Sequence, residues 1–151
     1  INLVYSWLEP HNIRLKITKP RRSKLGDFRV KSRKEPAIIS VNGNLNPFSF
    51  LITLTHEVAH LKDFDERKTL REAHGANWKR IYSNLLAEVI NTGAFPNELH
   101  PALQRHINNP KAADVFKETG EEFMEKNARD LMQECGNEFD LTPEDCQTLE
   151  E

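Results

Sequence analysis

Residues 47–61 read PFSFLITLTHEVAHL, and this stretch decides the fold. Asn46 precedes it and Pro47 opens it, which is the usual combination of an N-cap residue and a proline in the first helical position. Four aliphatic residues fall on one stripe when successive residues are placed about 100° apart: Leu51, Leu54, Val58 and Leu61. His56 and His60 lie away from that stripe. The spacing predicts a helix over 47–61 that buries its apolar side and presents both histidines on the other.

Three short runs before this helix have strand patterns. Residues 13–18 alternate aliphatic with basic or polar side chains, which is the period of a half-buried strand. Residues 28–31 repeat the alternation after a turn at Leu25-Gly26-Asp27, and Pro36 opens a third run over 37–42. We expect a small antiparallel sheet packed on the helix. Because a proline at the start of a strand costs least where no amide partner is needed, we expect 37–42 at the sheet edge.

Helices dominate the rest of the predicted domain. Residues 1–8 have the pattern of the end of a helix, which Pro10 terminates, and the polar, aperiodic residues 62–73 indicate a connecting loop. A helix then follows His74-Gly75 and ends at Gly93, and a shorter one is expected over 97–107. The longer helix has one broad apolar face: Trp78, Ile81, Tyr82, Leu85, Leu86, Val89 and Ile90. The predicted fold class is therefore α+β, a small sheet against one helix followed by further helices.

Length and composition restrict the class of protein. The chain has 151 residues, and 38% of them are hydrophobic, which suffices for one compact domain without disulfide support. No run approaches the roughly eighteen apolar residues of a membrane span, and no charged start followed by an apolar stretch has the pattern of a secretory signal, so no membrane partner is expected. Cys135 and Cys146 lack a CxxC spacing, which argues against a disulfide framework or a cysteine-based zinc site. We expect a cytoplasmic, reducing location.

Charge is distributed unevenly along the chain. Residues 1–36 hold ten Lys and Arg against three Asp and Glu, whereas residues 111–151 hold four against thirteen. The basic segment 14–34 could attract DNA phosphates, although a solvated surface without a partner is the simpler interpretation. We divide the chain into a domain over 1–110 and an acidic helical tail over 111–151, which either packs on the domain or binds a partner.

The pattern His56-Glu57-Val58-Ala59-His60 is the sharpest chemical signal. On a helix, positions i and i+4 project from one face, so two imidazoles can bind one ion while the glutamate points at a metal-bound water. Two ordinary surface histidines are the alternative. The predicted helix favours the metal site, because its apolar stripe faces away from both rings.

A catalytic zinc ion commonly has three protein ligands and one open position. His74 is the predicted third ligand, since it follows His60 after a loop long enough to reverse the chain. Gly75 would let the backbone approach the metal helix. Glu72 and Asp63 are alternative ligands, and either could instead orient a ligating histidine.

Two segments together resemble the SprT-like (Spartan-type) zinc metalloproteases. They are TLTHEVAHL (53–61) and EAHGANWKRIY (72–82), which fit an HExxH motif followed by a histidine in an HGxxW segment. The upstream segments SKLGDFR (23–29) and ISVNGNLNP (39–47) resemble the strand region of bacterial relatives, and the likeness covers about residues 12–110. It implies a zincin-like minidomain, Zn2+ held by three histidines, and proteolysis, which Spartan-type members direct at proteins crosslinked to DNA. After residue 110, an acidic tail stands where several relatives have a DNA-binding segment.

The expected activity is endopeptidase hydrolysis of a protein or peptide substrate, with Glu57 as general base and residues 37–42 pairing with an extended peptide. Tyr82 and Arg29 are weak candidates for the oxyanion donor, because both suit structural roles better. The alternatives are a noncatalytic, zinc-stabilised module that binds nucleic acid or protein, and a metal hydrolase acting on another bond. An intact Glu57 favours the enzymes.

The remaining histidines and aromatic residues suit structural roles. We expect His11, His100 and His106 at the surface or in turns, and Trp7, Trp78 and Tyr82 in the core.

Overall fold

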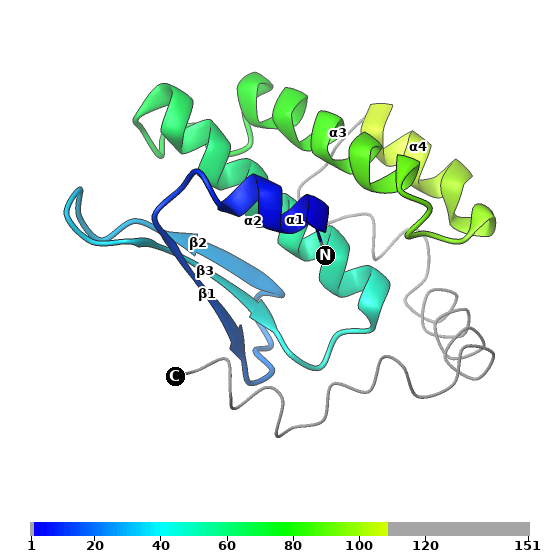
Figure 1. The fold of residues 1–151 in the computed structure, drawn as a ribbon, viewed down its shortest axis with the longest axis horizontal. Helices are drawn as coiled ribbons and strands as arrows, with labels where there is room; N and C mark the ends of the chain where they lie inside the picture. Colours follow the sequence, from blue (N-terminus) through cyan, green and yellow to red (C-terminus); the bar gives the residue numbers. More distant parts are fainter. Residues whose placement is uncertain (1, 109–151) are drawn as a thin grey trace.

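The computed structural model describes residues 2–108 (Figure 1). Within them the fold is α+β, with a three-stranded mixed sheet and four α-helices. The elements in chain order are α1 (Asn2–Leu8), β1 (Ile13–Thr18), β2 (Gly26–Arg29), β3 (Ala37–Asn42), α2 (Pro47–Arg67), α3 (Ala76–Asn91), the 3-10 helix η1 (Asn97–Leu99) and α4 (His100–Asn108). The acidic segment 111–151 and both cysteines lie outside the described residues.

The sheet differs from the predicted one in topology. The strand order is β1-β3-β2, with β1 parallel and β2 antiparallel to β3. The expectation of an antiparallel sheet is therefore wrong, and 37–42 forms the central strand rather than an edge. The most apolar strand occupies the centre, whereas the outer strands carry exposed charged residues such as Arg14 and Arg29. Pro36 lies one residue before the first paired residue of β3, so its missing amide hydrogen removes no hydrogen bond from the sheet.

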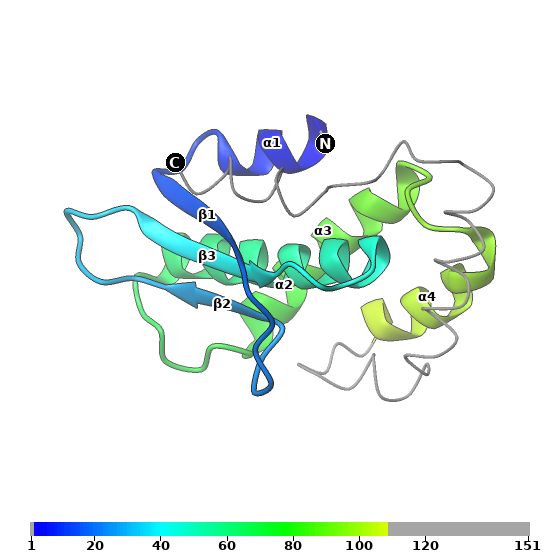
Figure 2. The same cartoon turned by 90° about the horizontal axis from the view of Figure 1, so that it is seen from below.

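Helix α2 packs on one side of this sheet (Figure 2). Its start matches the prediction, because the Asn46 side chain accepts a hydrogen bond from the Ser49 amide at 2.9 Å. The predicted apolar stripe is confirmed in its main part, since Leu54, Val58 and Leu61 are buried. The central strand and α2 therefore share one core, which fixes the orientation of the helix that carries the two histidines.

The far end of α2 was not predicted. The helix continues to Arg67, where a loop was expected from residue 62. Asp63 and Arg67 form an i,i+4 ion pair that supports the extra turns, and Lys68 ends the helix in the left-handed conformation at φ 58°. The connection to α3 is therefore the shorter segment 68–75.

The helices that follow agree with the prediction. Six of the seven apolar residues predicted for α3 are buried, and Gly93 follows the helix at φ +79°. Trp7 is buried and joins α1 to α3 by donating a hydrogen bond to the Glu88 carboxylate at 3.1 Å. None of the helices in the described part of the chain has the length and hydropathy that a membrane crossing requires.

Candidate metal centre

Three imidazole nitrogens converge at one point of the structure. His56 and His60 project from one face of α2, and His74 reaches them from the loop before α3. The Nε2 atoms are 3.1 Å apart between His56 and His60, 3.0 Å between His60 and His74, and 3.2 Å between His56 and His74. The three predicted ligands therefore form an almost equilateral triangle.

This triangle fits a shared cation. A tetrahedral ion with metal–nitrogen bonds of about 2.0–2.1 Å separates two ligand nitrogens by roughly 3.3–3.4 Å, a few tenths of an ångström more than the separations observed. Each imidazole nitrogen has only one in-plane lone pair or hydrogen, so three converging nitrogens cannot satisfy one another by hydrogen bonds. One cation between them satisfies all three lone pairs. The residues present therefore fit a metal site with three histidine ligands.

Burial keeps the imidazoles in the form that binds metal. Desolvation, followed by the neighbouring histidines, lowers the pKa of His56 to about 3, and desolvation with His74 lowers the pKa of His60 to about 4. The pKa of His74 is also lowered, mainly by desolvation. All three rings are thus neutral at neutral pH, and a neutral imidazole offers a lone pair to a metal.

Aromatic rings hold the histidines in place. Trp78 is fully buried, and its ring lies 4.7 Å from that of His56, 5.3 Å from His60 and 4.6 Å from His74, measured between centroids. Phe28 of β2 stacks on His60 at 6.5 Å with an interplanar angle of 10°. The predicted core role of Trp78 is confirmed, and the same ring supports the site.

Glu57 follows His56 on α2, and its side chain lies close to Gly26 of β2. Its side chain is buried with 6% of the residue exposed, and desolvation together with Asp27 raises its pKa to about 8. In the metal-free protein this carboxyl group is therefore mostly protonated at neutral pH, and a cation held by the three histidines would favour its carboxylate form.

Gly26 is a site residue that the sequence interpretation missed. It was assigned to a turn, yet it is the first residue of β2 and pairs with Val41. A Cβ atom at this position would lie 2.7 Å from Thr53 Cγ2 and 2.9 Å from Glu57 Oε1. The missing side chain therefore lets β2 approach Glu57 closely. A glycine at the start of a strand is the signal that could have indicated such an approach.

The alternative ligands lie outside the triangle. Asp63 binds Arg67 and Asn77, and Glu72 adopts a positive φ of 52° in the loop. A Cβ at Gly75 would lie 3.0 Å from the Glu72 carbonyl oxygen, so the nearest neighbour of this glycine is the loop itself. The structure groups neither carboxylate with the three histidines.

His106 was expected at the surface, and this expectation is wrong. It is 7% exposed, and its Nε2 lies 2.9 Å from the Tyr82 hydroxyl because α4 packs against α3. This bond occupies the Tyr82 hydroxyl, which argues against the oxyanion role. Arg29 is exposed and paired with Asp27, so it too has a structural partner. His11 and His100 are half-buried.

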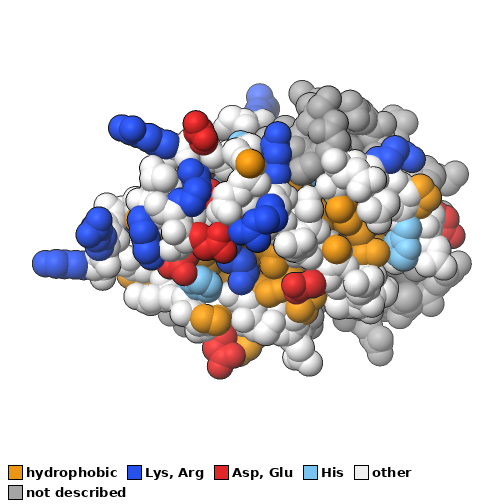
Figure 3. Space-filling model, turned by 90° about the horizontal axis from the view of Figure 1, so that it is seen from above, with side chains coloured by type: hydrophobic (Ala, Val, Ile, Leu, Met, Phe, Trp, Pro, Cys, Tyr) orange, Lys and Arg blue, Asp and Glu red, His pale blue; other side chains and the backbone are white. Residues whose placement is uncertain are grey.

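The basic segment is largely exposed. Three of its ten cations have partners, since Arg21 binds Asn42 and Ser40, and Lys24 and Arg29 pair with Asp27. The others are exposed: Arg14, Lys16, Lys19, Arg22, Lys31, Arg33 and Lys34. Figure 3 shows Lys and Arg side chains from the whole described chain gathered mainly over the left half of one face, and exposed cations outside the segment include Lys68, Arg71, Lys79 and Arg80.

Comparison with known proteins adds no assignment to this geometry. No protein-family model, no curated protein and no solved structure matched the chain. The resemblance to SprT-like proteases therefore stays a prediction based on the two motifs.

Proposed function

We propose that this chain is a zinc-dependent endopeptidase built on a zincin-like minidomain. The observation that supports it best is the triangle of His56, His60 and His74 Nε2 atoms, 3.0–3.2 Å apart, with the buried Glu57 on the same helix. A structural metal site needs ligands alone. A buried carboxyl group beside the ligands supports hydrolysis instead.

The histidines would hold Zn2+, and Glu57 would move the proton. Zinc, when bound there, would lower the pKa of a water molecule to about 7 and would polarise the scissile carbonyl. Glu57 accepts a proton from water as the water oxygen bonds to the carbonyl carbon. Glu57 then delivers that proton to the amide nitrogen as the carbon–nitrogen bond breaks, so the carboxylate is regenerated.

The outer edge of β2 is the proposed place for the substrate backbone. Residues 37–42 are paired on both sides and cannot accept a further strand. Strand β2 is an edge strand, and it touches the site twice, through Gly26 against Glu57 and through Phe28 against His60. An extended peptide that pairs with β2 would therefore pass beside the general base.

A Glu57→Gln substitution tests the function. We expect casein hydrolysis by the zinc-loaded protein to fall by roughly 10²–10⁴-fold, the usual contribution of a general base, while Zn2+ affinity stays within about threefold. Equal hydrolysis by both proteins, or none by the wild type across a broad set of substrates, would contradict the peptidase assignment. Zn2+ affinity is the control, because glutamine keeps the shape of the side chain.

Binding to DNA is a second candidate property, alone or as a means of reaching DNA-associated proteins. The observation that favours it is the exposure of Arg14, Lys16 and their basic neighbours. If these residues contact phosphates, affinity for a DNA duplex falls steeply between about 50 and 200 mM salt. Binding that is absent or independent of salt would remove this candidate.

A further inference from the structure

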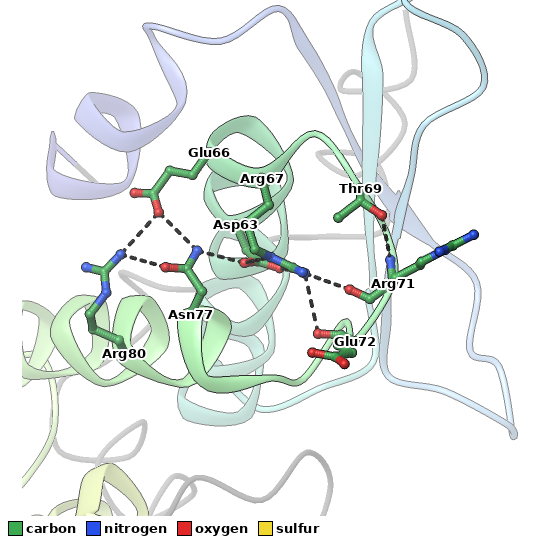
Figure 4. A network of polar contacts seen from close by, with 8 residues as sticks. All are labelled: Asp63, Glu66, Arg67, Thr69, Arg71, Glu72, Asn77 and Arg80. Atoms are coloured by element: carbon green, nitrogen blue, oxygen red, sulfur yellow. Dashed lines mark hydrogen bonds and ion pairs between the residues drawn. The ribbon is translucent and has the colours of Figure 1, made fainter.

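A polar network joins α2, α3 and the loop between them (Figure 4). Its centre is Asp63, which is 3% exposed and lies one helical turn after His60. The two carboxylate oxygens accept hydrogen bonds from Arg67 Nε and Nη2, both at 2.7 Å, and Oδ1 also accepts one from Asn77 Nδ2 at 2.8 Å. The Arg67 guanidinium keeps the pKa of Asp63 below its usual value. Asp63 and Arg67 therefore form a bidentate ion pair within α2, and Asn77 of α3 is the third partner of the carboxylate.

Arg67 carries this network into the loop. Its Nη2 atom donates to the backbone carbonyl of Arg71 at 2.8 Å and lies 3.4 Å from that of Glu72. The Glu72 carbonyl in turn accepts a hydrogen bond from the Gly75 amide at 2.8 Å, which closes a tight turn around His74. One guanidinium thus connects the metal helix to the turn from which the third histidine projects.

His74 is held on both sides by this network. Arg67 binds the backbone before it, at residues 71 and 72, and Asp63 binds Asn77 after it. His74 itself is exposed and belongs to no helix or strand, unlike His56 and His60. A ligand on a loop loses conformational freedom when it binds an ion, unless other contacts have already ordered the loop.

We propose that Asp63 and Arg67 are positioning residues that set the place of His74 and thereby the affinity of the metal site. The proposal deepens the proposed function, because it rests on the three histidines sharing one ion. Neither residue is expected to touch the metal or the substrate. Their effect is to order residues 71–75 before the ion arrives.

The same network contains a matched control. Arg80 on α3 donates to Glu66 Oε2 at 3.1 Å and to Asn77 Oδ1 at 3.0 Å. It is an arginine of the same network that joins α3 to α2 through Glu66, but its hydrogen bonds, unlike those of Arg67, do not reach residues 68–75. Loss of Arg80 therefore reports on the contact between the two helices without the loop.

The test compares Arg67→Gln with Arg80→Gln in Zn2+ affinity, measured by competition with a chromogenic chelator on the full chain. We expect Arg67→Gln to weaken Zn2+ binding by about 10–100-fold, the range typical when an outer contact of a metal site is lost. Asp63→Asn should do the same, and Arg80→Gln should stay within about twofold of wild type. Arg67→Lys should fall between, since one ammonium cannot serve both the carboxylate and the loop carbonyls.

A second measurement separates positioning from general destabilisation. In a His74→Ala background, Arg67→Gln should cause no further loss of Zn2+ affinity, because the ligand that it positions is gone. Far-UV circular dichroism of the metal-free variants should match the wild type. An equal loss for Arg67→Gln and Arg80→Gln, an undiminished loss in the His74→Ala background, or an unfolded Arg67→Gln protein would overturn the proposal.

The outcomes also distinguish this proposal from the proposed function. If the wild type binds Zn2+ and Arg67→Gln weakens that binding but no peptidase activity is found, the positioning role stands and the peptidase assignment fails. If hydrolysis depends on Glu57 but Arg67→Gln leaves Zn2+ affinity unchanged, the peptidase assignment stands and the positioning role fails. A wild type that binds no Zn2+ overturns both.

Discussion

Helix α2 and the loop 68–75 supply ligands to the same centre in different ways. On α2, the i,i+4 spacing places His56 and His60 on one face, and their Nε2 atoms lie 3.1 Å apart. In the loop, His74 has no such periodicity, and the surrounding backbone depends on Arg67 and on the turn closed by Gly75. The comparison teaches that the helix provides two ligands through regular geometry, whereas the third requires side-chain contacts made for that purpose.

The largest expected effect comes from removing one ligand from each region. Both His56→Ala and His74→Ala should weaken Zn2+ binding by roughly a thousandfold or more, because the binding free energy is shared among few ligands. Chelator competition measures this loss. Without metal, the two variants should differ in the free energy of unfolding measured in urea. His74→Ala should stay within about 0.5 kcal/mol of wild type, because His74 is exposed, whereas His56→Ala should be less stable by about 1–2 kcal/mol. Equal effects on metal-free stability would remove the contrast between the regions.

Gly26→Ala tests the other side of α2. The new Cβ would meet Thr53 Cγ2 at 2.7 Å and Glu57 Oε1 at 2.9 Å, so we expect a loss of about 1–3 kcal/mol in the free energy of unfolding and a lower kcat. Zn2+ affinity should stay within about twofold, because the new methyl group is directed at Glu57 and not at the imidazoles.

Gly43→Ala is the control for this substitution. Its Cβ would meet Ile17 Cγ2 at 2.9 Å, a similar crowding in the turn after β3. It should destabilise the fold while kcat remains unchanged. If both variants lower kcat equally, the effect of Gly26 would be general destabilisation rather than displacement of Glu57.

The smallest effect is a pH dependence of the metal-free protein. Burial lowers the pKa of His106 to about 4, below its usual value of 6.5, so the unfolded state binds more protons between these values. The free energy of unfolding should therefore fall as pH drops from about 6.5 to about 4, by up to about 1.4 kcal/mol per pH unit for this histidine. His56 and His60 act in the same direction. Glu57, with its pKa raised to about 8, acts in the opposite one between about pH 4.5 and 8.

Urea unfolding in the presence of a chelator measures this dependence. His106→Gln retains a polar partner for the Tyr82 hydroxyl but cannot titrate. Between pH 7 and pH 5, the free energy of unfolding of His106→Gln should fall by roughly 1–2 kcal/mol less than that of the wild type. Parallel losses for the two proteins would show that His106 is not the buried neutral group described here.

The sequence could predict the features that depend on local signals. The start of α2 followed from Asn46 and Pro47, and the pairing of His56 with His60 followed from helical spacing. The strand order could not be predicted, because alternation along β1 or β3 does not tell which strand lies beside it. The end of α2 was missed because the turn around Asp63 and Arg67 is polar and has no apolar period. The roles of Gly26 and His106 depend on contacts between distant segments, which no local pattern reports.

A crystal structure of the protein with bound Zn2+ tests the central claim most directly. We predict one anomalous difference peak at the zinc edge, at about 2.0–2.1 Å from the Nε2 atoms of His56, His60 and His74. An absence of density between these rings at saturating Zn2+, or an ion held without His74, would contradict the account.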